Sequence, residues 1–135
     1  MTSRCFLAST LFALVLAACS SKGERPQAAA SETPAAAGSA DPKGDAENIY
    51  NTRCTPCHGS TGAGDGAASA SLNPKPRNFR DAAWQSGVDD EYIEKIVAYG
   101  GQAVGKSAAM PPNPDLADKK DVIAALRAKV RSFRE

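Results

Sequence analysis

The chain has 135 residues, of which 42% are hydrophobic and 23% charged, and its 16 Lys and Arg nearly balance its 15 Asp and Glu. This balance argues against a basic nucleic-acid-binding surface and against an acidic, wholly disordered chain. Of the 27 large apolar residues, eight lie in 1–16, none in 20–43 and 19 in 44–135. The distribution excludes two compact domains. It predicts one small domain over 44–135, of a size that often needs a metal or cofactor to complete a thin core.

Residues 1–18 have the layout of a secretory signal, in which one cation, Arg4, precedes an apolar run. The run is too short to span a bilayer comfortably. It ends in Leu-Ala-Ala at 16–18 followed by Cys19, which resembles a bacterial lipobox. We therefore predict a lipoprotein with acyl chains on Cys19, held on the periplasmic side without a transmembrane helix. Ser20 mildly favours the outer over the inner membrane. The alternative is an ordinary signal cut before an incidental cysteine.

The segment 19–43 is predicted to be a tether. Between 20 and 43, 16 of the 24 residues are Ala, Ser, Pro or Gly, and none is large and apolar. Such a segment buries too little to offset the entropy lost on ordering. Random-coil scaling gives it an average reach of roughly 25–30 Å. That reach suits a domain that visits partners.

Residues 45–53 are predicted to form a helix with Ile49 and Tyr50 inward, leading into the sequence Cys-Thr-Pro-Cys-His at 54–58. This is the pattern of covalent c-type haem attachment. The spacing matters because two thiols add to the two vinyl groups of one haem edge, while the next imidazole is held under the iron. Cys54 and Cys57 are therefore the predicted thioether positions, and His58 is the predicted proximal ligand.

Three other interpretations compete for the two cysteines. A redox Cys-x-x-Cys pair does not need His58, and no βαβ pattern surrounds it. A zinc site needs a fourth ligand, but His58 is the only histidine, while Cys5 and Cys19 belong to the signal and the lipid site. A disulfide between Cys54 and Cys57 would close a very short, strained loop. We therefore predict haem attachment.

Two further helices and a loop complete the domain. Residues 89–99 have acidic residues first, then apolar residues at helical period, and a glycine pair after them. Residues 118–133 have one apolar stripe, with cations toward the end. Met110 lies between them, and two prolines after it prevent a helix. Once the signal is removed it is the only methionine, and with no second histidine it is the predicted second axial ligand. The alternative is a core filler.

On these motifs, residues 45–135 resemble class I cytochrome c, the family of small monohaem electron carriers. The resemblance rests on Tyr50, Cys54, Cys57, His58, the glycine-rich stretch 59–66, the stretch 74–79, Trp84 and the Met-Pro-Pro sequence at 110–112. It implies an all-α cytochrome c fold with one covalent haem c. In that fold the N- and C-terminal helices cross, and a third helix and the Met loop enclose the haem.

Three departures from the family pattern bear on this expectation. The resemblance implies glycine at 46 and an aromatic residue at 129, where the terminal helices cross. Ala46 and Lys129 stand there instead, which predicts a looser or shifted crossing. Ala67 replaces a proline. This change predicts a less rigid loop for the carbonyl that accepts the His58 Nδ1 proton, a bond that helps to set the iron potential.

Arg77 and Trp84 are expected to contact the haem propionates, because a cation and an indole N–H both stabilise a carboxylate. The alternatives are a solvated loop arginine and simple packing of the tryptophan. Lys75, Arg80 and Lys106 are candidates to ring an exposed edge and steer an acidic partner. A random scatter of charge is the alternative to that arrangement.

The predicted function is an exported, membrane-tethered carrier of single electrons from a quinol-oxidising donor to an oxidase or reductase. With His58 and Met110 both on the iron, no position is open for oxygen or peroxide, so no enzymatic activity and no small-molecule substrate are expected. Thioether ligation also raises the potential. One alternative is a haem subunit permanently docked in a respiratory oxidoreductase complex. The other is a peroxidase or gas-binding protein with a labile Met110, which would lack a distal acid–base group.

Overall fold

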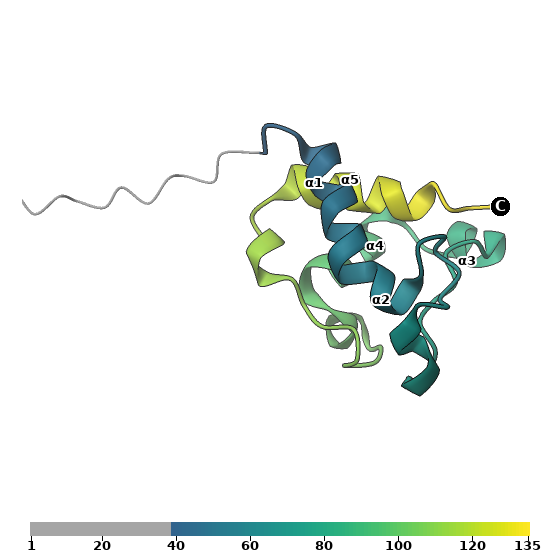
Figure 1. The fold of residues 1–135 in the computed structure, drawn as a ribbon. Helices are drawn as coiled ribbons and strands as arrows, with labels where there is room; N and C mark the ends of the chain where they lie inside the picture. The colour runs from purple at the N-terminus through teal and green to yellow at the C-terminus, as the bar shows by residue number, and fades with distance from the viewer. Residues whose placement is uncertain (1–38) are drawn as a thin grey trace, which may run out of the picture. The chain divides into compact units, whose positions relative to one another are not determined.

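The computed structural model of the protein describes residues 39–135, and Figure 1 shows their arrangement. The predicted signal, Cys19 and most of the predicted tether lie outside the described residues. The elements of 39–135 are helical throughout, so the all-α prediction is confirmed for that part of the chain. None of its helices is both long and apolar enough to cross a membrane.

The first helical run consists of α1 (Pro42–Ile49), a π-helical segment (Tyr50–Cys54) and α2 (Thr55–His58), which follow one another without a break (Figure 1). The Asp41 side chain caps the run by accepting the Gly44 N–H at 2.9 Å, and Pro42 at the first helical position has no N–H that would need an acceptor. The run ends at Gly59, whose φ of 78° favours glycine. The helix predicted over 45–53 thus begins earlier and continues through the haem-binding motif.

α4 (Asp90–Tyr99) and α5 (Lys120–Arg131) agree with the other two predicted helices, apart from a shorter α5. Asp89 caps α4 by accepting the Tyr92 N–H at 2.7 Å. α5 packs against both α1 and α4, and α1 crosses α5 in Figure 1. The expected crossing of the N- and C-terminal helices is therefore present.

Shorter elements, which the sequence did not predict, fill the connections. They are α3 (Ala82–Gly87) and the 3₁₀ segments Ala67–Ser71, Gly101–Val104 and Pro114–Leu116. α3 forms because the Asp81 side chain accepts the N–H groups of Ala83 and Trp84, at 2.9 and 3.1 Å. Helices this short have too few turns to produce a clear apolar period.

Where α1 packs against α5, an aromatic pair and a lysine lie together. Ala46 is 2% exposed, and Lys129 Nζ pairs with Glu47 at 2.9 Å while lying over the rings of Tyr50 and Phe133. The Phe133 ring lies 5.2 Å from the Tyr50 ring. The two helices are therefore in contact where Ala46 and Lys129 lie, with the Phe133 ring against Tyr50, and the looser or shifted crossing stays a prediction.

Candidate haem-binding site

The two cysteines and the histidine of the motif lie at the end of the first helical run. Cys54 and Cys57 are free thiols and half-buried, and they lie three positions apart, so they share one side of a helical backbone. His58 follows at once and is 8% exposed. This donor set fits one covalent haem c, since it supplies two thiols on one side and an adjacent imidazole.

Burial raises the pKa of the Cys54 thiol to about 11. The thiol is therefore protonated at neutral pH. Catalytic redox cysteines have lowered pKa values, because the thiolate is the nucleophile. This environment argues against the redox-pair interpretation.

The His58 ring is oriented by a hydrogen bond from Nδ1 to the backbone carbonyl of Arg77, at 3.1 Å. With Nδ1 as the donor, Nε2 keeps its lone pair for a metal ion. Burial also lowers the pKa of His58, which favours the neutral ring. The expectation that the acceptor lies in the loop at Ala67 is wrong. Ala67 begins a 3₁₀ segment, and the acceptor lies on Arg77, further along the chain.

The glycine-rich stretch 59–66 packs against the C-terminal end of the haem-binding motif. The N–H groups of Gly64 and Gly66 donate to the carbonyls of His58 and Cys57 at 2.8 and 3.2 Å. A Cβ on Gly66 would overlap the carbonyl oxygens of Thr55 and Pro56. Only glycine lets this backbone approach the motif so closely.

Phe79 packs directly on His58. Its ring stacks on that of His58 with centroids 4.4 Å apart and planes 15° apart. Its backbone is held at both ends, since its N–H donates to the Gly62 carbonyl at 2.7 Å and its carbonyl accepts from Gln85 Nε2 at 2.7 Å. Gln85 is 3% exposed and also donates to the Val130 carbonyl at 2.9 Å. No sequence signal distinguished this buried glutamine.

Arg77 and Trp84 lie together beside this cluster. The Arg77 guanidinium is 5.8 Å from the centroid of the Trp84 ring and pairs with Asp81 at 3.6 Å. The Trp84 ring lies 5.6 Å from that of Phe79. The two predicted propionate contacts therefore share one surface next to Phe79, while their role toward the propionates stays a prediction.

Met110 is half-buried, and its backbone is tied to the end of α4. Its carbonyl accepts the Gly101 N–H at 3.0 Å, and its N–H donates to the Ser107 carbonyl at 3.3 Å. A Cβ on Gly100 would come within 2.9 Å of the Met110 oxygen, so the loop lies close against this glycine pair.

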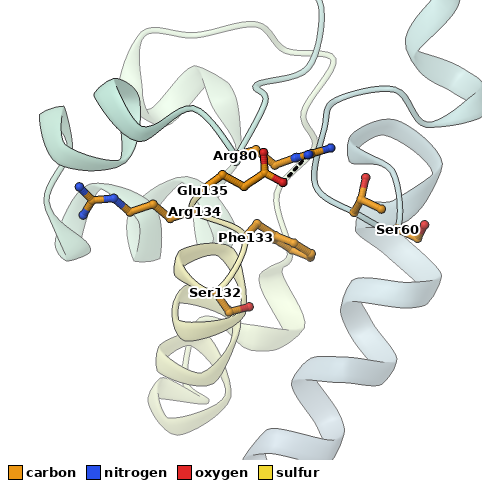
Figure 2. Close-up of a pocket in the computed structure, with 7 residues that line it drawn as sticks. Ser60, Arg80, Ser132, Phe133, Arg134 and Glu135 are labelled. Atoms are coloured by element: carbon orange, nitrogen blue, oxygen red, sulfur yellow. Dashed lines mark ion pairs between the residues drawn. The ribbon is translucent and has the colours of Figure 1, made fainter.

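Two of the three candidate steering cations are engaged elsewhere. Lys75 Nζ donates to the carbonyls of Ser69 and Ala70 at 2.9 and 3.2 Å. Arg80 pairs with Glu135, beside Phe133 in a surface cavity of about 460 Å³ that Figure 2 shows. This cavity is not lined by the haem-binding motif. These contacts fix the two side chains, and their place around an exposed haem edge stays a prediction.

The comparisons with known proteins give one match. Residues 42–127 match the family described as cytochrome c oxidase, cbb3-type, subunit III. No curated protein and no solved structure matches. The matched residues cover more than half of the chain and include Cys54, Cys57, His58 and Met110. The chain therefore belongs to this cytochrome c family, and it is a c-type cytochrome that carries electrons with one covalent haem c.

Proposed function

We propose that Cys54 and Cys57 hold the haem as thioethers and that His58 Nε2 and the Met110 sulfur are its two axial ligands. The observation that carries the proposal is the pair of free, half-buried thiols next to an imidazole whose Nδ1 is already bonded to a carbonyl. When bound, the haem supplies one-electron chemistry. With His58 and Met110 both holding the iron, no position would be open to a substrate, so the protein would pass electrons without binding one.

The residues around His58 would hold its imidazole in one orientation and shield it from water. The Arg77 carbonyl holds the His58 ring in one tautomer and raises its basicity. The Phe79 ring covers a face of the imidazole and limits its rotation. The exposed Arg77 guanidinium and the half-buried Trp84 lie together nearby, which suits contacts with the negatively charged propionates.

We further propose that the protein is exported and held at the membrane by acyl chains on Cys19. The support is the order of apolar run, small residues and cysteine in the sequence, followed by a polar stretch. From this position the domain would take electrons from a quinol-oxidising donor and give them to an oxidase or reductase on the periplasmic side.

Mass spectrometry of the purified protein tests attachment and anchoring together. The expected result is one haem plus acyl chains on a chain that begins at Cys19. An unlipidated chain with another start would refute the anchor and leave the haem assignment intact. Met110→Ala should abolish the weak long-wavelength sulfur-to-iron band of the oxidised protein. Absence of that band from the wild type would refute Met110 ligation.

A second candidate is a haem subunit docked permanently in an oxidase complex. It is favoured by the matched family, whose description names an oxidase subunit. Gentle detergent extraction distinguishes the two candidates. A fixed subunit co-purifies with its complex in a constant ratio, whereas a mobile carrier is recovered alone.

A further inference from the structure

Arg53 joins the haem-binding helical run to the segment that follows Met110. Its Nη1 and Nη2 donate to the two carboxylate oxygens of Asp115, at 2.8 and 2.9 Å. Nη1 also lies 3.3 Å from Oδ1 of Asn113. Within residues 39–135, no other hydrogen bond or ion pair joins 50–58 to 107–116. These three side chains, here called the clamp, are therefore the polar link between the two parts of the site.

The clamp is built on backbone that is itself fixed. Asn113 Nδ2 donates to the Val97 carbonyl at 2.8 Å, and the Asn113 N–H donates to the Ala98 carbonyl at 2.9 Å. Asp115 lies on the 3₁₀ segment Pro114–Leu116, whose Leu116 is 1% exposed. Movement of Met110 away from the haem-binding run would therefore pull against Asn113, three residues along the chain.

We propose that the clamp is a positioning device that holds the Met110 segment closed and so sets how often the Met110 sulfur leaves the iron. This inference rests on the proposed role of Met110 as an axial ligand. The backbone bonds of Met110 itself go to Ser107 and Gly101, and these partners lie on its own side of the site. The Arg53 and Asp115 side chains are 45% and 48% exposed, so their attraction is modest and is screened by salt.

Imidazole binding to the oxidised holoprotein tests the proposal, because imidazole takes the iron position only when the methionine leaves. Arg53→Gln and Asp115→Asn should each raise the apparent imidazole affinity about two- to fivefold, the range that an exposed ion pair permits. The two variants change the net charge in opposite directions, so a shared effect reports the loss of the pair. The double variant should add little to either single change.

Glu47→Gln is the matched control, since it breaks a 2.9 Å pair with Lys129 that joins α1 to α5. It should leave the imidazole affinity unchanged. Rising salt should raise the affinity of the wild type toward that of the double variant, and should leave the double variant nearly unaffected.

Two results would overturn the proposal in distinguishable ways. If the wild type shows the sulfur-to-iron band but Arg53→Gln and Asp115→Asn bind imidazole as Glu47→Gln does, the clamp has no positioning role and the Met110 assignment survives. If the wild type lacks the band, the Met110 assignment fails and the clamp proposal fails with it.

Discussion

Replacing Gln85 by leucine should destabilise the protein because the buried carbonyl of Phe79 loses its hydrogen-bond donor. Gln85 Nε2 donates to the carbonyls of Phe79 and Val130, and its Oε1 accepts from Arg131 at 3.0 Å. The Val130 carbonyl keeps a second donor in the Phe133 N–H at 3.4 Å. The Arg131 guanidinium keeps several other acceptors. The Phe79 carbonyl loses the one donor that the described residues give it.

The expected loss of stability follows from these hydrogen bonds. Leucine nearly preserves the volume of glutamine, so no large cavity forms. An unsatisfied buried carbonyl costs about 1–3 kcal/mol, and one lost hydrogen bond to a charged donor adds little where others remain. We therefore expect Gln85→Leu to lower the free energy of unfolding by about 1–3 kcal/mol.

Denaturant unfolding of the holoprotein, followed by circular dichroism, measures this change. Gln102→Leu is the matched control, because Gln102 is exposed and its side chain makes no hydrogen bond within the described residues. That control should stay within about 0.5 kcal/mol of the wild type. Equal stabilities for the two variants would refute the role assigned to Gln85.

Three more outcomes are expected. Gly66→Ala should sharply reduce the yield of haem-attached protein, because the added Cβ would overlap the backbone of the haem-binding motif. Gly87→Ala is the control and should leave the yield unchanged, because Gly87 has open space around it. The ratio of haem to protein absorbance measures both variants. Cys54→Ala/Cys57→Ala should lose most helical circular dichroism, because the thin core depends on the haem, and unchanged helix would contradict this. The pKa of Asp115 lies below its ordinary value because Arg53 donates hydrogen bonds to the carboxylate. The ionised Asp115 therefore stabilises the folded protein at a pH above the pKa of the unfolded chain, and this contribution is lost as the pH falls through the pKa of the folded protein. Asp115→Asn should therefore flatten the acid side of the stability curve, and a curve of unchanged shape would contradict this.

Features encoded by nearby residues could be predicted from the sequence. The spacing of Cys54, Cys57 and His58 identified the haem motif because the chemistry needs that register. The apolar periods of 89–99 and 118–133 located two helices, and each buries apolar residues: Ile93 and Ala98 in α4, and Val122, Ile123, Leu126 and Val130 in α5. The start of the first helix was misplaced because its cap, Asp41, lies within a stretch whose composition is typical of a tether.

Contacts between distant parts of the chain could not be predicted in the same way. The acceptor of the His58 Nδ1 proton is a backbone carbonyl 19 residues away. Every residue has a backbone carbonyl, so the residue type at a position does not reveal which carbonyl is the acceptor. Gln85 has the same difficulty, since a glutamine is ordinarily exposed and only the fold places its amide between two carbonyls. Phe79 was visible as part of a family stretch, but its stacking on His58 depends on the path of the loop that precedes it.

The two sides of the site are held by interactions of different strength, and this difference determines where perturbations will be seen. On the histidine side, His58 and Phe79 are at most 8% exposed, and Gln85 is 3% exposed. On the methionine side, backbone hydrogen bonds and an ion pair with nearly half-exposed side chains hold the loop. Segments with few buried contacts open at lower free energy than the whole domain. Changes near His58 should therefore lower global stability. Changes near Met110 should instead alter the ligand spectrum and imidazole binding while the fold persists.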